Sequence, residues 1–529
     1  MTKVKGKQTD RGWVTDLQMG LQNKYISSAN NISATTGSAP EIFSAALNFF
    51  AASQCLLSER FQPDIIKDRE TFDFIIIGAG SAGSVVANRL SEVNHWNILL
   101  LEAGPDPPIE SLIPRFDSTL YGSDYDWKYL MKRGDDSSLG FIGERVPWPR
   151  GKMLGGSSSI NGMVYMRGKS GDYQRWVDAG NPSWTPQNTL FYFNKAENFQ
   201  DRELLKNPYI SYYYGHDGPL IIDTFNSSFS DITEPLLDSR NRIGFEKVDD
   251  LNTAPIPNNL GVAGVFRATA ANGQRQSTYE AYIKPARHRK NLKIIINTFA
   301  TKILIDSDLR AYGVEVNVSG KIINIYASRE VILSAGSINT PQLLMLSGVG
   351  PQEHLEDIGI ETKLNLPGVG KNLQDHIYVP IPIFGDEPGP EDKGKMYFDA
   401  IRYLYDRSGY LGELSFLAIR MLFIQFQSHL TFYFQNSTEL KSLFKSYKES
   451  AQKSLLESNK NKALYLFSFH LLHPFSKGSI YLNSSDPYDY PVIDGNFFSD
   501  RRDLESSTEG IRLLTRIIET PYFRSINAF

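Results

Sequence analysis

Residues 71–83 read TFDFIIIGAGSAG, and this stretch decides the fold class. Phe72–Ile77 is an almost unbroken apolar run, as expected for a central strand of a parallel sheet that is covered on both faces. A GxGxxG pattern follows directly. In such a pattern Gly78 allows the tight turn, Gly80 lets the backbone approach a pyrophosphate, and Gly83 lets a helix pack close to the sheet.

The chain after the glycines continues as a strand–helix–strand unit. Ala82, Val86 and Leu90 recur at helical spacing and predict one face of a helix. Asn97–Leu101 (NILLL) is a second short apolar run, and Glu102 follows at its carboxyl end, where an acidic residue meets a ribose hydroxyl pair. These residues predict a dinucleotide site, but they do not by themselves separate FAD from NAD.

Composition excludes several other classes of protein. A chain of 529 residues is long enough for two or three domains. Its 55 basic and 59 acidic residues give no reason to expect a nucleic acid as partner. Cys55 is the only cysteine and the eight histidines show no HExxH spacing, so we predict no disulfide and no metal site. No run of eighteen apolar residues occurs, so we predict no transmembrane helix.

The pattern predicts three regions: an N-terminal lead at 1–70, a first domain at 71–370 and a second domain at 371–529. The lead contains Ile42–Leu57 (IFSAALNFFAASQCLL), which resembles a signal-peptide core displaced behind about forty polar residues. The compartment is left open, with secretion favoured by the family named below and by N-glycosylation sequons. These sequons lie at Asn31, Asn226, Asn317, Asn436 and Asn483.

Further elements are expected along the chain. A meander with one wet face is predicted for Lys293–Asn297, Lys302–Ile305, Tyr312–Val318 and Lys321–Ala327. Glu330–Ser334 is expected to be a separate buried strand. A helix should follow within Ser337–Gly348, capped by Thr340, with Pro341 in its first turn and Gly348 at its end. Pro380–Lys395 is predicted to be a loop, and Ser442–Lys462 a polar surface helix.

A second glycine-lined segment indicates which of the two dinucleotides, FAD or NAD, is expected. Trp148–Gly168 reads WPRGKMLGGSSSINGMVYMRG, and its Gly155–Ser158 turn can present several backbone N–H groups to an anion or to a polar ring edge. This stretch and Gly336–Pro351 (GSINTPQLLMLSGVGP) resemble the two signature motifs of the glucose-methanol-choline (GMC) oxidoreductase family. FDFIIIGAGSAGSVVANRLSE, LLLEAGPDPP and the SDYDW of Ser123–Trp127 are most similar to insect-type glucose dehydrogenases.

The resemblance, which runs from about residue 71 to 529, implies a fold, a cofactor and a reaction. It implies an α/β FAD-binding Rossmann-like domain with an inserted β-meander, and an α+β substrate domain. It also implies FAD as cofactor, hydride transfer from a CH–OH group of an alcohol or sugar to flavin N5, and a quinone-like electron acceptor. The cofactor-binding residues that it implies are Gly78, Gly80, Ser81, Gly83, Glu102, Arg150, Met153, Gly156, Ser157, Asn161, Gly162, Met163, Val164 and Ala300.

The catalytic residues of this family are not matched. The family's chemistry needs a base for the alcohol proton and a second polar group, which the resemblance implies to be a His and a His or Asn partner near the carboxyl end. His473 is followed by proline, but LLHPFSKGSIYLNSSDP matches an upstream strand segment, so we expect it to be structural. Asp375 and His376, in VGKNLQDH, are interpreted as a domain-junction motif. No histidine follows His473, so the catalytic pair is expected beyond Phe529, in a truncated chain of low activity.

Two alternatives stay open. The chain is either an enzyme of this lineage, or an inactive paralogue or incomplete gene model that keeps a flavin-binding or structural role. The apolar run at Tyr410–Gln427, where the family has a Gly-rich entrance, and the displaced signal-like segment favour an incomplete gene model or an alternative transcript. The expected open edge of the FAD sheet predicts that the chain folds poorly. An NAD-dependent dehydrogenase would share the GxGxxG and leave Gly155–Val164 unexplained.

Overall fold

The computed structural model describes residues 64–529 except 135–136, 225–229, 256–260, 387–401, 404–405, 414–418, 423–425, 435–443 and 461. The signal-like Ile42–Leu57 and the sequons at Asn31, Asn226 and Asn436 therefore lie outside the described residues, as do parts of Tyr410–Gln427. The described residues belong to the unit Gln62–Phe529, and the predicted domain boundary near 370 stays a prediction.

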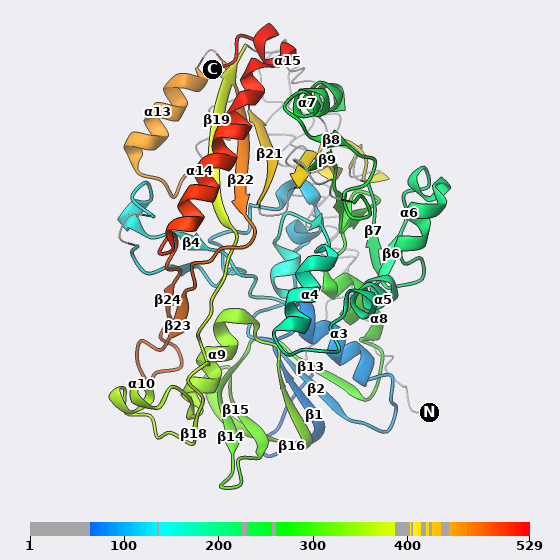
Figure 1. Ribbon diagram of the computed structural model, residues 1–529. Helices are drawn as coiled ribbons and strands as arrows, with labels where there is room; N and C mark the ends of the chain where they lie inside the picture. Colours follow the sequence, from blue (N-terminus) through cyan, green and yellow to red (C-terminus); the bar gives the residue numbers. More distant parts are fainter. Residues whose placement is uncertain are drawn as a thin grey trace, which may run out of the picture. The chain divides into compact units, whose positions relative to one another are not determined.

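The first sheet is built around the strand that the opening stretch predicts. Its order is β13-β2-β1-β16-β15-β14, and β1 pairs in parallel with both β2 and β16 (Figure 1). Ile75 and Ile76 in β1 are fully buried, as expected of a strand covered on both faces. The bounds are β13 (Leu292–Ile295), β2 (Ile98–Leu101), β1 (Thr71–Ile77), β16 (Lys321–Leu333), β15 (Ala311–Val318) and β14 (Thr298–Ile305).

β16 corrects one prediction. The two strands expected at Lys321–Ala327 and Glu330–Ser334 are one strand of thirteen residues, which changes partner along its length. Residues 321–326 pair with β15, and residues 326–333 pair with β1. The exposed Ser328–Glu330 interrupts the apolar pattern but not the backbone, which is why the sequence suggested a break. Among the described residues, nothing pairs with the other edge of 330–333.

Helix α3 (Ser81–Leu90) forms where the pattern predicts it, but with another face inside. The predicted face of Ala82, Val86 and Leu90 is not the buried one; the buried residues are Gly83, Ser84, Ala87 and Asn88. Small side chains lie inward because the helix packs directly against the β1 turn, and a Cβ on Gly83 would lie 1.9 Å from the Gly78 carbonyl oxygen. Apolar spacing predicts the buried face only where a layer of side chains separates the helix from the sheet, and here backbone lies against backbone.

Helix α9 (Gly336–Leu346) begins one turn earlier than predicted. Its N-cap is Ala335, so Thr340 does not cap the helix, and Pro341 lies inside it. Gly348 follows the end of the helix with a φ of +85°, as the sequence predicts. The early start brings the first turn of α9 to the end of β16, next to the β1 turn, where Ser334 contacts Gly78.

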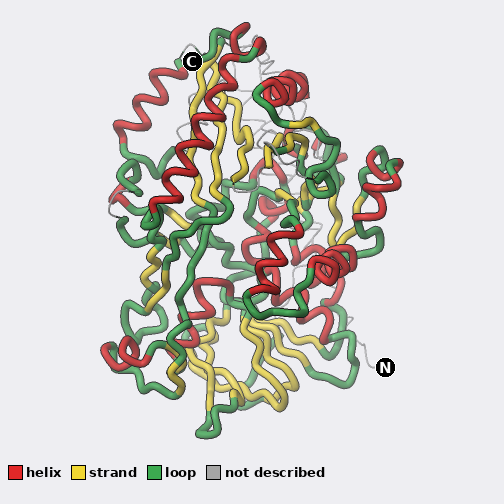
Figure 2. Tube along the Cα trace, viewed as in Figure 1, coloured by secondary structure: helices red, strands yellow, loops and turns green. Residues whose placement is uncertain are grey.

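The second sheet has the order β19-β22-β21-β20-β9-β8 and carries helices on both faces (Figures 1 and 2). Helix α13 (Glu449–Asn459) packs on the face of β22 that carries Leu464 and Leu466, opposite the face that carries Tyr465 and Phe467. Helix α14 packs on β22, and helix α7 packs on β9. The bounds are β19 (Ile377–Gly385), β22 (Ala463–Leu471), β21 (Phe426–Phe434), β20 (Ile419–Leu422), β9 (Val262–Val265), β8 (Glu246–Lys247), α14 (Arg501–Thr515) and α7 (Ser230–Arg242).

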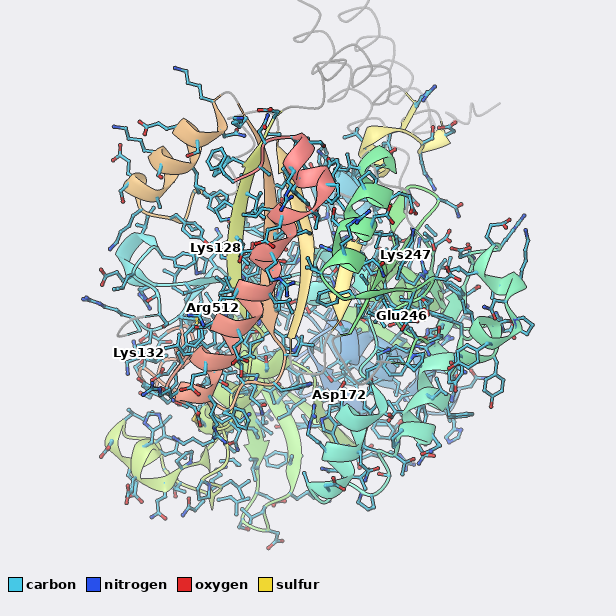
Figure 3. All side chains as sticks on the ribbon, turned by 45° about the horizontal axis from the view of Figure 1, so that its top comes forward. Lys128, Lys132, Asp172, Glu246, Lys247 and Arg512 are labelled. Carbon is cyan, nitrogen blue, oxygen red and sulfur yellow. The ribbon has the colours of Figure 1, made fainter. Side chains whose placement is uncertain are left out.

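Both edge strands of this sheet have sequence features typical of edges. Pro380 and Pro382 lie within β19, so the loop predicted from Pro380 is wrong up to Gly385, because an edge strand tolerates residues without an N–H donor. At the opposite edge, Glu246 and Lys247 of β8 are both exposed (Figure 3). Charged side chains on an edge strand oppose pairing with another chain.

The remaining helices and strands are short. The helix predicted within Ser442–Lys462 is α13 (Glu449–Asn459). The others are β3 (Tyr129–Leu130), β4 (Pro147–Trp148), β5 (Val164–Tyr165), α4 (Ser170–Asp178), α5 (Pro186–Ala196), β6 (Glu197–Phe199), α6 (Pro208–Tyr213), β7 (Leu220–Ile222), β10 (Arg267–Ala268), β11 (Ala270–Ala271), β12 (Gln274–Arg275), α8 (Lys284–Ala286), β17 (Val349–Gly350), α10 (Gln352–Asp357), β18 (Leu364–Asn365), β23 (Ser479–Tyr481), β24 (Val492–Asp494) and α15 (Pro521–Ser525).

Two buried ion pairs lie beside the two-residue ladder between β5 and β10. Arg267 Nε lies 3.0 Å from Asp250 Oδ1, with both side chains almost fully buried. Arg167, just after β5, pairs with the fully buried Glu197. Because a ladder of two residues is weak by itself, these pairs fix β5, and with it the end of the second glycine-lined segment.

We expect Arg267→Met to destabilise the protein strongly. The substitution leaves the buried Asp250 carboxylate without its cation, a change that typically costs about 3–5 kcal/mol. The thermal unfolding midpoint, followed by circular dichroism, should fall clearly. Arg501→Ala is the matched control, since the Arg501–Glu505 pair lies at the surface, and should leave the midpoint unchanged within error. Equal effects of the two substitutions would contradict the role given to the buried pair.

Candidate functional site

The first turn of the site is shaped by two glycines. Gly78 has a φ of +96°, and a Cβ there would lie 2.5 Å from the Ser334 carbonyl oxygen. The corresponding Cβ on Gly83 would overlap the Gly78 carbonyl oxygen. The end of β1, the start of α3 and the end of β16 therefore approach one another so closely that a larger residue at either position would displace backbone.

The second glycine-lined segment lies directly against the first. Gly155 N–H donates to the Ala79 carbonyl oxygen at 2.8 Å. Gly156 has a φ of +52°, and a Cβ there would lie 2.7 Å from the Cα atom of Gly80. The two segments, more than seventy residues apart in the sequence, thus meet through their backbones, as the sequence led us to expect.

A cavity of about 650 Å³ opens where the two segments meet. This volume lies within the usual range for small-molecule and cofactor sites. Eight of the fourteen predicted cofactor-binding residues line it: Gly78, Gly80, Ser81, Glu102, Arg150, Gly156, Ser157 and Ala300. The cavity thus brings together the ends of β1 and β2, the β14 strand and the Gly155–Ser158 turn.

The other six predicted residues do not line the cavity; they are Gly83, Met153, Asn161, Gly162, Met163 and Val164. Gly83 lies beneath the first turn, and Met153 and Met163 are fully buried in apolar clusters. Asn161 Oδ1 accepts a hydrogen bond from Met163 N–H at 3.1 Å, which closes the far end of the second segment. A flavin contact for these residues stays a prediction.

Glu102 occupies the carboxyl end of β2. Its Oε2 accepts from Ala79 N–H at 2.9 Å, and its Oε1 accepts from Gly104 N–H at 2.9 Å. Burial raises the pKa of Glu102 to about 7, and the two backbone hydrogen bonds only partly oppose that rise. Two backbone hydrogen bonds therefore hold the carboxyl group at the cavity wall, where burial disfavours its charged form. A further hydrogen-bond donor from a ligand would favour the charged form.

Sequence reasoning missed the aromatic wall of the cavity. Trp127 and Phe299 both line it, with their ring centroids 6.1 Å apart. Lys152 Nζ lies 4.8 Å from the Trp127 ring centroid. Trp127 stands in the SDYDW motif, which served only to mark a resemblance, and Phe299 precedes the predicted Ala300. The first half of α9, including Ser337 and Thr340, completes the wall.

A second cavity of about 450 Å³ shares Arg150, Ser337, Thr340 and Pro341 with the first. Asp375 lines this second cavity, and burial raises its pKa. Among the described residues that line the two cavities, none is a histidine.

His473 lies elsewhere, on a half-exposed surface. Its ring Nδ1 is 3.0 Å from Arg175 Nη2, and its Nε2 is 3.2 Å from Asp172 Oδ1. The contact joins the segment after β22 to α4, and the structural role predicted for His473 stays a prediction. Within the described part of the chain, no group of three His, Cys, Asp or Glu side chains could hold a metal ion, and no helix is long and apolar enough to cross a membrane.

The donor set of the first cavity fits the adenosine and pyrophosphate of FAD. Backbone at Gly80 and Gly156 leaves no side chain between the cavity and the N–H groups of the turns. The start of α3 carries the positive end of a helix dipole. Glu102 offers an acceptor for ribose hydroxyls, and Arg150 offers a cation.

Comparison with known proteins gives one consistent family. GMC oxidoreductase matches residues 72–378 in its N-terminal part and residues 474–527 in its C-terminal part. The ecdysone oxidase of Bombyx mori is 39% identical over 503 residues, covering 93% of this chain and 74% of that protein. The glucose dehydrogenase [FAD, quinone] of Drosophila melanogaster is 36% identical over 499 residues, covering 92% and 76%.

Solved structures agree with the sequence matches. A formate oxidase of Aspergillus oryzae superposes with a TM-score of 0.71 and is 26% identical, covering 87% of this chain and 83% of that chain. The likeness therefore covers most of the chain.

Gly156→Ala should weaken FAD binding at least tenfold. The added Cβ would lie 2.7 Å from the Gly80 Cα atom, at a φ that L side chains rarely adopt, so the two turns must separate. Titration of apoprotein with FAD, followed by quenching of flavin fluorescence, gives the dissociation constant. Gly171→Ala is the matched control, because a Cβ at Gly171 meets nothing within 4 Å. Unchanged affinity in Gly156→Ala would refute the role of this contact.

FAD affinity should fall as the pH falls from 8 to 6. Ribose hydroxyls donate to a carboxylate, so FAD binds best to deprotonated Glu102, whose pKa burial raises to about 7. At pH 6 most Glu102 carboxyl groups are protonated and must lose the proton when FAD binds. This cost weakens the affinity by about tenfold relative to pH 8. Glu102→Gln should bind more weakly at both pH values and show little pH dependence. A variant that retains the full pH dependence would assign it to another group.

Proposed function

The chain belongs to the GMC oxidoreductase family, whose members are FAD-dependent, and we propose that it oxidises the CH–OH group of a small alcohol or sugar. The observation that carries the proposal is the backbone contact of Gly80 with Gly156 at the wall of the main cavity. That contact brings the dinucleotide turn and the family's own signature segment to one site.

Different residues that line the main cavity are assigned to different parts of the cofactor. We assign the pyrophosphate to the backbone of Gly80 and Ser157 together with the Arg150 side chain, and the ribose to Glu102. Ala300, on the opposite wall, is assigned to adenine. Bound FAD supplies the acceptor for the two electrons and the hydride that leave the alcohol carbon.

Two substrate classes are supported by the relatives. Ecdysone oxidase, at 39% identity, favours an alcohol group of an ecdysone-like compound, whereas glucose dehydrogenase, at 36%, favours a sugar. Similarity to the glucose dehydrogenase [FAD, quinone] also supports a quinone as the electron acceptor. Secretion is proposed from the family and the sequons, of which Asn483, after β23, is exposed.

A second candidate function is FAD binding with little turnover. It is favoured by the lining of the two cavities, where none of the described residues is a histidine, and by the contacts of His473 with Asp172 and Arg175 on the surface. Loss of the proton acceptor typically lowers a rate by about 10²–10⁴-fold.

One experiment separates these functions. The purified chain should show the absorbance band of bound flavin at about 450 nm. If the chain is an enzyme, anaerobic addition of substrate should bleach that band. Ecdysone and glucose are added separately, and a quinone is then added to restore the band. Absence of bound flavin would refute the proposed function, whereas bound flavin that neither substrate bleaches would favour the second candidate.

A further inference from the structure

Arg275 is a buried cation that the cofactor assignments do not use. It ends the short strand β12, and only 1% of its surface is exposed. Of the other buried arginines, Arg167 and Arg267 each pair with a carboxylate, Glu197 and Asp250, whereas Arg240 packs over the Phe467 ring. Arg275 forms no ion pair with any described residue, and its hydrogen-bond acceptors are neutral oxygens.

These acceptors come from two segments distant from β12. Nε donates to the Ser111 carbonyl oxygen at 2.7 Å. Nη1 lies 3.2 Å from the Ser158 carbonyl oxygen, and 2.6 Å and 2.8 Å from the Asn161 carbonyl oxygen and Oδ1. One guanidinium thus joins β12 and the residues near 111 to the back of the turn whose front, at Gly156 and Ser157, lines the main cavity.

A neighbouring contact supports the same turn. Thr278 N–H donates to Ser158 Oγ at 3.0 Å, and Ser158 Oγ also reaches the Gly155 carbonyl oxygen at 2.6 Å. The turn needs such support because Gly155 and Gly156 have positive φ. Met163, two residues beyond the turn, also has a positive φ, which is unfavourable for a residue with a side chain. Hydrogen bonds to a buried guanidinium are stronger than neutral ones and offset that cost.

We propose that Arg275 is a positioning residue for the cofactor: it holds the Gly155–Asn161 turn in the conformation that receives FAD, and it adds positive charge behind that turn. The inference rests on the proposed function. Burial lowers the pKa of Arg275 to about 10, so the side chain is charged at neutral pH. The Asp117 carboxylate, which is also buried, raises the pKa of Arg275 and partly balances its charge. A cation behind the turn favours a ligand that carries negative phosphates.

The test compares Arg275→Met, Arg275→Lys and Arg240→Met in the full chain. Arg275→Met removes the charge and all of the hydrogen bonds, whereas Arg275→Lys keeps the charge and part of the bonding. Arg240→Met is the matched control: Arg240 is fully buried on α7, has no hydrogen-bond partner among the described residues and lies outside the cavity lining. Each protein is measured for its FAD dissociation constant, its visible flavin spectrum and the thermal midpoint of the apoprotein.

We expect Arg275→Met to weaken FAD binding by about tenfold or more and to shift the flavin spectrum, with Arg275→Lys recovering part of both. Arg240→Met should keep the affinity and the spectrum of the original protein. Wild-type affinity and spectrum in folded Arg275→Met would overturn the inference, as would equal losses in Arg275→Met and Arg240→Met. If Arg275→Met does not fold, Arg275→Lys decides by itself: an unchanged dissociation constant and spectrum would overturn the inference. Failure of the unsubstituted chain to bind FAD would instead refute the proposed function.

Discussion

The architecture of the site depends on the contact of two glycine turns through bare backbone. Gly78 and Gly83 bring β1, α3 and β16 together, and Gly156 then approaches Gly80 so closely that no side chain fits between them. The main cavity exists because these turns meet at the carboxyl ends of parallel strands, where the sheet leaves a crevice. Every other wall, including Glu102 and the first half of α9, is placed relative to that junction.

The sequence predicted the parts of this site that local pattern controls. The apolar run of β1, the glycine spacing and the acid at Glu102 each follow from a short stretch, and the structure places them as expected. The buried face of α3 was not predictable from apolar spacing, because its neighbour is backbone rather than a layer of side chains. The single β16 strand was missed because a change of pairing partner leaves no gap in the backbone but does expose side chains.

Long-range contacts account for what the sequence could not supply. Trp127 and Phe299 form one wall although more than 170 residues separate them, and nothing local marks either as a partner of the other. The buried arginines show the same limit. Arg167, Arg267 and Arg275 look alike in a sequence, yet two neutralise carboxylates and one bonds only to neutral oxygens. Their roles differ because their surroundings differ.

The pairing of β16 has a consequence for the behaviour of the protein in solution. Its last residues, Val331–Leu333, are apolar, only half buried, and bonded on one side to β1. Unlike β8, this strand edge carries no charged side chain at 331–333 that would oppose pairing with a strand of another molecule. A strand from a neighbouring molecule could add there, and such oligomer growth would be second order in protein. Dilute refolding should therefore yield more dispersed material than concentrated refolding.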